Sequence, residues 1–443
     1  MKSNNVCIIG LGYVGFPLAI ALSNVKKKQH FKYSVFGYDN DKKKVDQIID
    51  SIKNKKLPIK SHDHDLIKKF KNSSNKNKIN LIENFKDIQK MNIIVISVGF
   101  DFFGNKHSFR NIIELIKRIS KLIKKGSLLL IETTLPPGTY EKILIPEIKK
   151  IIKKRGLKLD DIHLGYSHER IMPGKRYYNS MINNYKCYSG YDKISKVKVC
   201  NFLKSFINYK KFPLIELNSI TECETAKVLE NSYRAINIAL IDEWVNYSNL
   251  IKIDLLKVIK AIKVRPTHSN IMAPGLGVGG YCLPKDGLFA KKSAKFIYKS
   301  NISFPFIDLA ARINNKMPST AFKFIESKTK LNNKKILIMG TAYKENIDDE
   351  RLSPSIDLIN KLKKKGSLIT KFDPMINKNS MPSFSKYDIV IFCVNHKKIK
   401  DISFLLFSKK PIYFDLNNVI EEKKINLMKK RKFKLFLLGR NYD

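Results

Sequence analysis

A strand, a glycine-rich turn and a helix follow one another at the start of the chain, and this arrangement constrains the fold more than any other feature. Residues 6–9 are apolar and residues 16–23 have a helical pattern. Between them, Gly10, Gly12 and Gly15 have Gly-x-Gly-x-x-Gly spacing. The first glycine permits a tight turn, the second lets a diphosphate approach the backbone, and the third lets the helix pack closely on the strand. The sequence therefore predicts a dinucleotide-binding βαβ unit.

The end of the second predicted strand indicates which dinucleotide binds. Residues 33–39 read as a strand that ends in Asp39. A carboxylate there accepts hydrogen bonds from a ribose diol and repels a 2′-phosphate, so we expect NAD rather than NADP. The alternative is a structural glycine turn in another α/β fold. The residues expected to bind the cofactor are Gly10, Gly12, Tyr13, Val14, Gly15, Asp39, Val98 and Thr134.

Strands and helices alternate through the following segments. Strands at 93–98 and 127–132, with amphipathic helical segments between them, predict a parallel sheet with right-handed crossovers. The loop at 133–139 follows a strand's carboxyl end, where ligands bind in such sheets. The Lys-, Asn- and Ser-rich residues 53–80 are expected to form a mobile surface loop.

The same alternation returns in the last third of the chain. Residues 335–344 restart the strand–turn–helix pattern, and further strands are predicted at 368–372, 389–394 and 412–416. Residues 219–249 form one long helical pattern, which also suits a dimer spine. We therefore predict an α/β protein with two Rossmann-like, doubly wound parallel-sheet domains joined by a long central helix. The predicted domains are residues 1–215, 216–315 and 316–443.

One loop carries the strongest indication of covalent chemistry. Residues 275–286 contain glycines at 275, 277, 279 and 280, followed by Cys282, Lys285 and Asp286. Glycines let the backbone approach a ligand, and a cation near a partly exposed cysteine favours the nucleophilic thiolate. The pattern predicts a positioned thiolate at Cys282, with Lys285 as the source of positive charge. The alternative is a buried structural cysteine beside a glycine-rich turn.

Polar side chains on the long helix form a stripe. Lys227 and Asn231 lie four residues apart on one face, and Arg234 and Asn237 continue the stripe. The stripe faces either a ligand or solvent.

A late loop presents two cations at the end of a predicted strand. Residues 343–354 include Lys344 and Arg351, which suit a diphosphate. The alternative is that Asp348 and Asp349 balance these charges.

The composition argues against several other classes of protein. The net charge of +45 reflects 84 Lys and Arg against 39 Asp and Glu. Lysine greatly outnumbers arginine, which is typical of an AT-rich genome, so we expect no nucleic-acid partner. Six scattered cysteines without a Cys-x-x-Cys pair argue against a disulfide framework and a zinc site, so we expect no metal and a cytoplasmic protein. No apolar run reaches ~18 residues and the N-terminus runs straight into a strand, so we expect neither a membrane segment nor a signal peptide.

Taken in order, six motifs closely resemble those of the UDP-glucose/GDP-mannose dehydrogenase family. They are the Gly10-x-Gly12-x-x-Gly15 fingerprint, 132–134, 167–175, Lys227 with Asn231, the 275–286 loop, and Gly340 with Lys344, Asp349 and Arg351. The resemblance covers nearly the whole chain. It implies a first domain that binds NAD, a helical dimerisation domain with the catalytic cysteine loop, and a last domain that binds the UDP-sugar. It also implies a homodimer or a higher homo-oligomer.

The reaction that the resemblance implies is a four-electron oxidation of a sugar C6 alcohol to a carboxylate, with two NAD in succession. The Cys282 thiolate traps the aldehyde as a thiohemiacetal, whose oxidation gives a thioester. By resemblance, Lys227 and Asn231 stabilise the oxyanion. Asp286, together with Thr134, positions or activates water, and Glu169 is the base for thioester hydrolysis. The residues expected to bind the substrate are Glu169, Arg170, Lys227, Asn231, Arg234, Arg265, Gly279, Gly280, Lys344 and Arg351, with Arg265 acting either in its own subunit or in a neighbouring one.

The chain departs from the family pattern at two places. Residues 97–100 replace the Thr-Pro that commonly follows this strand, and Pro173 stands where the UDP-glucose branch has a second glutamate. A two-carboxylate account of hydrolysis therefore does not transfer. The altered loop also motivates a different class of protein, a non-catalytic nucleotide-binding protein of the same fold.

The branch motifs indicate the substrate. Residues 169–175, 230–239 and 265–280 resemble the UDP-N-acetylhexosamine dehydrogenases, whose substrates are of the ManNAc, GlcNAc or GalNAc type. Residues 283–286 instead resemble the UDP-glucose branch. We expect a UDP-N-acetylhexosamine dehydrogenase that serves surface polysaccharide synthesis, with UDP-glucose 6-dehydrogenase as the alternative.

Overall fold

The computed structural model describes residues 4–27, 30–59, 61, 63–100, 108–174, 176–377 and 380–440, without the side chains of Lys27 and Ser108. Lys175, which ends the motif at 167–175, lies outside the described residues. The chain divides into two compact units. The N-terminal unit comprises residues 1–230 and 288–302, and the C-terminal unit comprises residues 231–287 and 303–443. The three predicted domains, with boundaries after residues 215 and 315, stay a prediction.

A sheet forms the centre of the N-terminal unit. In the described part of the chain it has eight strands, in the order β10-β9-β8-β7-β6-β1-β4-β5. Neighbouring strands run parallel, except that β8 and β9 are antiparallel. The strands are β1 (Asn4–Ile9), β4 (Tyr33–Tyr38), β5 (Ile79–Leu81), β6 (Ile93–Ile96), β7 (Leu128–Ile131), β8 (His163–Ser167), β9 (Lys186–Gly190) and β10 (Leu214–Glu216). A separate antiparallel pair is formed by β2 (Lys26–Lys27) and β3 (His30–Phe31).

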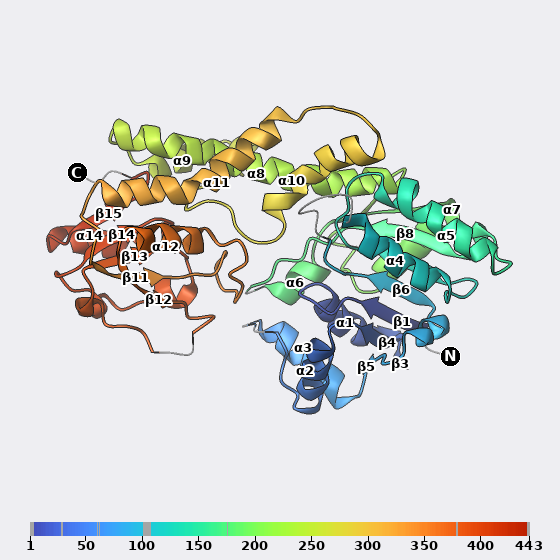
Figure 1. The fold of residues 1–443 in the computed structure, drawn as a ribbon. Helices are drawn as coiled ribbons and strands as arrows, with labels where there is room; N and C mark the ends of the chain where they lie inside the picture. The colour runs from blue at the N-terminus through green and yellow to red at the C-terminus, as the bar shows by residue number, and fades with distance from the viewer. Residues whose placement is uncertain are drawn as a thin grey trace. The chain divides into compact units, whose positions relative to one another are not determined.

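Helices cover both faces of this sheet (Figure 1), and the side chains of β1 show why. Cys7 and Ile9 pack with α4 and α5 on one face, whereas Val6 and Ile8 pack with α1 and α3 on the other. Alternate residues of a strand point to opposite faces, so a strand that is apolar throughout needs helices on both sides. The helices of this unit are α1 (Gly15–Ser23), α2 (Lys42–Lys53), α3 (His64–Asn75), η1 (Phe85–Lys90), α4 (Ser108–Ser120), η2 (Tyr140–Leu144), α5 (Ile145–Lys153), η3 (Leu159–Asp161), α6 (Tyr177–Ile182), α7 (Lys193–Leu203) and η5 (Ser293–Ile297).

The C-terminal unit repeats the arrangement with a smaller sheet. Its described strands number five and run parallel in the order β12-β11-β13-β14-β15. They are β11 (Lys335–Met339), β12 (Leu368–Phe372), β13 (Ile389–Phe392), β14 (Ile412–Asp415) and β15 (Leu435–Leu437). The helices are α9 (Leu255–Ile262), η4 (Pro266–His268), α11 (Pro305–Glu326), α12 (Pro354–Lys364), η6 (Phe384–Lys386), α13 (Lys397–Lys400), η7 (Phe404–Leu406) and α14 (Glu422–Lys430). The predicted α/β fold with two parallel sheets is confirmed, apart from the antiparallel step between β8 and β9.

Two helices contribute residues to both units. α8 (Ile220–Leu250) occupies the stretch predicted as a long helix, and neither Pro nor Gly interrupts its 31 residues. Its residues up to Glu230 belong to the N-terminal unit. α10 (Leu283–Lys292) changes unit after Gly287. In the part of the chain that the structure describes, no helix combines the length and apolar character needed to cross a bilayer.

The described part of residues 53–80 contains regular structure, so the prediction of a mobile surface loop was wrong. It includes α3 and the start of β5. Asp63 caps α3 by accepting a hydrogen bond from the backbone N–H of Leu66, 3.1 Å away. Leu66 and Phe70 are fully buried and pack with α1. A lysine- and asparagine-rich composition concealed these two apolar residues, which hold the helix on the core.

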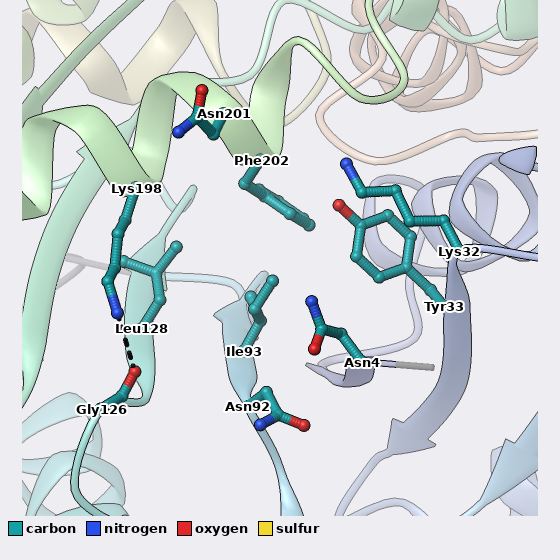
Figure 2. A pocket seen from close by; sticks show the side chains of 10 residues that line it. All are labelled: Asn4, Lys32, Tyr33, Asn92, Ile93, Gly126, Leu128, Lys198, Asn201 and Phe202. Atoms are coloured by element: carbon teal, nitrogen blue, oxygen red, sulfur yellow. Dashed lines mark hydrogen bonds between the residues drawn. The ribbon is translucent and has the colours of Figure 1, made fainter. Parts of the chain in front are cut away.

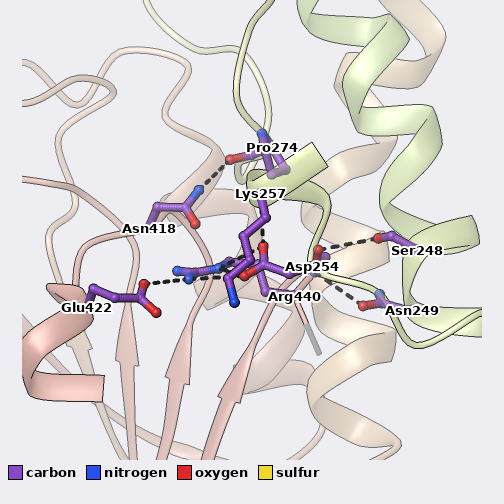
Figure 3. Close-up of polar contacts among 9 residues, drawn as sticks. Ser248, Asn249, Asp254, Lys257, Pro274, Asn418, Glu422 and Arg440 are labelled. Atoms are coloured by element: carbon purple, nitrogen blue, oxygen red, sulfur yellow. Dashed lines mark hydrogen bonds and ion pairs between the residues drawn. The ribbon is translucent and has the colours of Figure 1, made fainter. Parts of the chain in front are cut away.

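The end of the described chain is tied to the helical part of the C-terminal unit (Figure 3). Arg440 Nη2 donates to Glu422 Oε2 at 2.9 Å, and Arg440 Nε donates to Asp254 Oδ1 at 3.3 Å. The side chains of Arg440 and Asp254 are both buried. Next to them, Ser248 Oγ donates to the carbonyl of Gly439 at 3.4 Å. The segment after β15 is therefore fixed to α8 and to the start of α9.

We expect Arg440→Met to destabilise the C-terminal unit by about 3 kcal/mol, because it leaves the buried Asp254 carboxylate without this cation. Trp244, the only tryptophan of the chain, lies on α8 within this unit, so its fluorescence during urea unfolding measures the change. Lys430→Met, at an exposed lysine that ends α14, is the control and should change the free energy of unfolding by less than about 0.5 kcal/mol. Equal unfolding midpoints for Arg440→Met and the unmodified protein would contradict the expectation.

Candidate functional site

The glycine-rich loop after β1 has the geometry of a diphosphate cradle. Gly10 has φ of +95°, and a side-chain carbon there would lie 2.6 Å from the carbonyl oxygen of Ser97. A side-chain carbon at Gly15 would lie 1.9 Å from the carbonyl oxygen of Gly10, so the helix packs against the turn as predicted. By contrast, apart from Gly12 and its two chain neighbours, no described residue has an atom within 4 Å of the corresponding position at Gly12. The backbone at Gly12 therefore has space on the side from which a diphosphate would approach.

The residues beside this cradle are held by backbone contacts. The carbonyl of Tyr13 accepts a hydrogen bond from the Tyr177 hydroxyl, and Val14 immediately precedes α1. Thr133 Oγ1 donates to the carbonyl of Val98 at 2.8 Å, which joins the loops after β6 and β7. Thr134 follows and is half-buried. The predicted cofactor residues thus lie at the carboxyl ends of β1, β4, β6 and β7.

Asp39, at the end of β4, is an ionised acid in the right place for a ribose. Its Oδ2 accepts hydrogen bonds from the backbone N–H of Leu11 and from Lys44 Nζ, both at 2.8 Å. Burial opposes ionisation, but the hydrogen bonds from Lys44, Leu11 and Asp41 outweigh it and lower the pKa of Asp39. Lys44 offsets part of the charge that would repel a 2′-phosphate. The open Gly12 backbone and the acid of Asp39 together fit NAD.

A buried cluster of ionisable side chains lies at the carboxyl ends of β7 and β8. Lys186 Nζ is 2.7 Å from Glu132 Oε1 and 2.8 Å from Glu169 Oε2. The Glu169 carboxylate also accepts from the backbone N–H of Arg170 at 2.7 Å, and Arg170 Nε donates to Glu230 Oε2 at 2.8 Å. The sequence predicted roles for Glu169 and Arg170 but none for Lys186, and it mentioned Glu132 only as part of a motif.

Lys227 lies on the first part of α8 and is buried. Burial, together with the charges of Lys227 and Arg170, holds the pKa of His168 well below its usual range. The neutral His168 ring is hydrogen-bonded through Nδ1 with the carbonyl of Cys223, 3.3 Å away. These residues place a cation and a neutral imidazole in the N-terminal unit.

Glu224 is a second residue that the sequence analysis missed. It lies on α8, and its carboxyl accepts from the backbone N–H groups of Gly138, at 2.6 Å, and Tyr140, at 3.0 Å. Complete burial raises the pKa of Glu224 to about 8. The only indication of this contact in the sequence was an acid within an apolar helical pattern. Glu224 anchors the loop that follows β7.

In the C-terminal unit, Cys282 stands at the start of α10. Its carbonyl accepts the N–H groups of Lys285, at 3.1 Å, and Asp286, at 2.9 Å, which closes the first helical turn. The thiol is exposed and forms no disulfide. Exposure at a helix N-terminus favours the thiolate. The interpretation of Cys282 as a buried structural cysteine is therefore wrong.

Lys285 contacts the two residues beside the cysteine loop's end, Asp286 and Tyr281. Its buried Nζ lies 2.7 Å from Asp286 Oδ1 and 4.6 Å from the centre of the Tyr281 ring. The other oxygen of Asp286 accepts from Asn231 Nδ2 at 2.6 Å. Asp286 is fully buried and connects α8 to α10 through these contacts.

The glycines before Cys282 pack against the loop that follows β11. Gly280 N–H donates to the carbonyl of Arg351 at 3.1 Å. Gly280 has φ of +82°, and a side-chain carbon there would lie 2.4 Å from the Tyr343 ring. A side-chain carbon at Gly279 would lie 2.6 Å from the carbonyl oxygen of Leu352. Residues 279–280 therefore need glycine for close packing, and this packing brings the cysteine loop to the loop at 343–354.

The cations of that loop have different environments. Arg351 Nη2 lies 2.6 Å from Asp349 Oδ2, and the guanidinium lies over the Tyr281 ring. The pairing of Arg351 with Asp349 agrees with the alternative of balanced loop charges. Lys344 is half-buried, and burial, followed by the charge of Arg234, lowers its pKa. Lys344 and the exposed Arg234 thus form a cationic pair.

Two further residues that the sequence analysis named are Arg265 and Asn237. Arg265 is exposed just before η4. Asn237 Oδ1 accepts from the backbone N–H of Met272 at 3.1 Å, so this member of the polar stripe holds a neighbouring segment.

The C-terminal sheet contains a counterpart of Asp39 that is closed off. Asp373 follows β12, and its Oδ2 accepts from the backbone N–H of Thr341 at 2.7 Å. The same oxygen accepts from His396 Nε2 at 3.0 Å, since His396 Nδ1 accepts from the backbone N–H of Asn346. Asp373 and His396 are fully buried. This acid stabilises the turn after β11.

A cavity of about 330 Å³ opens at the other edge of the N-terminal sheet (Figure 2). Its lining includes residues at the amino ends of four strands, namely Asn4 (β1), Tyr33 (β4), Ile93 (β6) and Leu128 (β7). Ligands of such sheets bind at the carboxyl ends, so this cavity is not the predicted dinucleotide site.

Comparison with known families agrees with this architecture. The NAD binding domain of the UDP-glucose/GDP-mannose dehydrogenase family matches residues 4–200, its central domain matches residues 221–316, and its UDP binding domain matches residues 337–422.

Individual relatives match over almost their whole length. A UDP-N-acetyl-D-mannosamine dehydrogenase of Methanococcus maripaludis is 30% identical and covers 98% of this chain and 96% of its own. A UDP-N-acetyl-D-glucosamine 6-dehydrogenase of Pseudomonas aeruginosa is 28% identical, with 96% and 100% covered. The solved structure of a UDP-D-ManNAc dehydrogenase from Pyrococcus horikoshii superposes with a TM-score of 0.81 at 25% identity, covering 98% of this chain and 99% of that chain.

We expect a thiol reagent to modify Cys282 first. Its side chain is exposed, whereas Cys7, Cys223 and Cys393 are buried and burial raises the pKa of each of these thiols. The folded protein is treated briefly with iodoacetamide, and the modified peptides are mapped by mass spectrometry. Cys282 should be modified at least roughly tenfold faster than the buried cysteines. Cys282→Ser should remove the fast phase and Cys200→Ser should keep it. Equal rates at a buried cysteine would contradict the expectation.

Proposed function

Because the chain belongs to the UDP-glucose/GDP-mannose dehydrogenase family, we propose that it oxidises the C6 alcohol of a UDP-N-acetylhexosamine to a carboxylate through a covalent intermediate on Cys282. The predictions of this family, of an enzyme and of NAD as cofactor are confirmed by the family match. One observation carries the mechanistic proposal. The exposed thiol stands at a helix N-terminus, and the glycines before it pack on the 343–354 loop of the matched UDP binding domain.

The thiolate of Cys282 is the nucleophile of the proposed reaction. NAD, when bound, accepts a hydride at each of the two oxidations. After the first, the Cys282 sulfur bonds to the aldehyde carbon and gives a thiohemiacetal, and the second oxidation converts this adduct to a thioester. A covalent adduct keeps the aldehyde from escaping.

Asn231 and Lys227 are the proposed oxyanion donors. The Asn231 amide nitrogen carries two hydrogens, and one is held by Asp286. Its orientation is therefore set before substrate binds, which is what electrostatic stabilisation of an oxyanion requires. Since Asn231 and Lys285 engage both Asp286 oxygens, we propose that Asp286 orients Asn231 and does not itself deprotonate water.

Glu169 is the proposed base for hydrolysis of the thioester. It removes a proton from water, the water oxygen bonds to the carbonyl carbon, and the Cys282 thiolate leaves with the electron pair of the broken carbon–sulfur bond. Thr134, half-buried at the same sheet edge, is a proposed contact for this water. For the nucleotide, we propose Lys344 and Arg234 as diphosphate contacts, with Arg351 and residues 279–280 shaping the site.

The relatives favour an N-acetylated sugar. The Methanococcus maripaludis and Pseudomonas aeruginosa relatives, which match this chain over most of its length, act, by name, on UDP-N-acetyl-D-mannosamine and UDP-N-acetyl-D-glucosamine. The motif at 283–286 keeps UDP-glucose as the second candidate.

The test is a panel of UDP-ManNAc, UDP-GlcNAc, UDP-GalNAc, UDP-glucose and GDP-mannose, with NADH followed by absorbance and the acid by mass spectrometry. We expect two NADH per N-acetylated sugar, and kcat/KM at least roughly tenfold higher than with UDP-glucose. Cys282→Ala should form no acid. A preference for UDP-glucose would assign the second substrate, and acid formation by Cys282→Ala at the unmodified rate would refute the covalent role.

The exposed face of α8 suits a second copy of the chain. Tyr233, Leu240, Trp244 and Tyr247 of α8, and Ile251 directly after it, are between 43% and 52% exposed. They recur at spacings of three, four and seven residues, which places them on one stripe. An aromatic and aliphatic stripe on one helix can pair with its own copy about a two-fold axis. We propose that the protein is a homodimer through α8.

Leu240→Glu should convert the dimer to a monomer in sedimentation velocity, because it places a carboxylate at the centre of this stripe. Asn246→Glu adds the same charge to an exposed residue on another side of α8 and should leave the dimer intact. A monomeric unmodified protein, or a dimeric Leu240→Glu variant, would exclude α8 as the interface.

A further inference from the structure

The buried cluster in the N-terminal unit holds more acid than base. The side chains of Glu132, Lys186 and Glu169 are 0%, 4% and 9% exposed, respectively. With all three ionised, this triad would carry a net charge of −1. An uncompensated buried charge is unfavourable, so the triad retains one proton between its two carboxyl groups over part of the pH range.

Glu132 is the member suited to carry that proton. Its Oε1 faces Lys186, while its buried Oε2 accepts no hydrogen bond from any described residue. Complete burial raises the pKa of Glu132 to about 7 against the opposing charge of Lys186, and the neighbouring Glu169 carboxyl raises it further, by its charge and as a hydrogen-bond partner.

The other ionisable groups described beside the triad are not the source of the proton on Glu132. Arg170 is paired with Glu230, 2.5 Å away, and Lys227 is a cation on α8. His168 is neutral because its pKa is lowered by burial and by these cations. Burial also raises the pKa of the Cys187 and Cys223 thiols, so both stay protonated.

We propose that Glu132 and Lys186 are positioning residues for Glu169, with Lys186 fixing its carboxylate and Glu132 storing the proton that Glu169 takes from water. This inference rests on the proposed role of Glu169 as the base for thioester hydrolysis. Lys186 donates to one Glu169 oxygen and the N–H of Arg170 donates to the other, so the carboxylate cannot rotate. After water gives a proton to Glu169, the proton passes to ionised Glu132 and Glu169 returns to its charged form. No electrons are transferred in this step.

The protonation state of Glu132 determines whether thioester hydrolysis becomes faster or slower as pH rises. Below about pH 7 its carboxyl is already protonated and cannot accept the proton from Glu169. Above that pH the carboxyl is ionised and accepts the proton from Glu169. Thioester hydrolysis should therefore accelerate as pH rises through neutrality.

The experiment compares Glu132→Gln with the unmodified enzyme across pH 6 to 9, using the substrate that the panel identifies. Unmodified enzyme should show kcat rising through about pH 7. Glu132→Gln should lose this rise, with kcat about tenfold lower at pH 8 and KM within about twofold. Intact-protein mass spectrometry should find the thioester adduct on Cys282 accumulating in this variant, after a normal first burst of NADH.

Two further variants separate this role from a structural one. Glu132→Asp keeps an ionisable carboxyl and should restore the rise with pH. Glu224→Gln neutralises another fully buried glutamate of the same unit, whose partners are backbone N–H groups, and should reduce stability without changing the shape of the pH profile. If Glu132→Gln does not fold, Lys186→Arg replaces it. Arginine can bind both carboxylates in their ionised form, so the rise should move to lower pH.

An unchanged pH profile in Glu132→Gln, or an unshifted one in Lys186→Arg, would overturn the inference while leaving the proposed function intact. Failure of the proposed function gives a different result, since the unmodified enzyme would then form neither two NADH per sugar nor an adduct on Cys282.

Discussion

Parallel pairing of β1 with β4 and β6, and of β6 with β7, is the constraint on which the N-terminal site depends. Strands that run the same way end at the same edge, so the four loops that follow them meet there. The contacts between loops are then short. The backbone of Leu11 reaches Asp39, and Thr133 reaches the carbonyl of Val98. Departure from the usual Thr-Pro at residues 97–100 leaves this second contact in place, because it uses a backbone carbonyl and does not depend on the side chain.

Features encoded within a short window could be predicted from the sequence. The glycine spacing, the acid at the end of a strand and an uninterrupted helical pattern each depend on neighbouring residues, and the fold class follows from their order. The partners of Lys186 could not be predicted in this way. They lie 54 and 17 residues away and become neighbours only when β7, β8 and β9 pair. A buried lysine at the start of a strand looks the same in sequence as the many solvated lysines of this chain.

Charge was the least transferable guide, because a cation near a predicted site can pair with an acid of its own loop or turn. Lys285 follows Cys282 closely, yet the first turn of α10 directs its ammonium to Asp286. Arg351 was expected to face a diphosphate, and its guanidinium binds Asp349. In both pairs the cation holds an acid of its own loop or turn. The net charge of the chain therefore says little about the polarity of the site, where the acids are buried and bonded.

The two sheets show how one local pattern can serve two purposes. Both begin with a strand and a glycine of similar conformation, Gly10 with φ of +95° and Gly340 with φ of +96°. In both, an acid from the next strand accepts backbone N–H groups of this turn, Asp39 in one and Asp373 in the other. Asp39 keeps a partly exposed lysine as its other partner, whereas Asp373 is sealed by a buried imidazole. A ligand can compete for a carboxylate in the first environment, since an exposed ion pair contributes little. In the second it would have to displace a buried hydrogen bond, which costs more. The same acid therefore remains available to a ribose in the N-terminal unit and becomes part of the scaffold in the C-terminal unit.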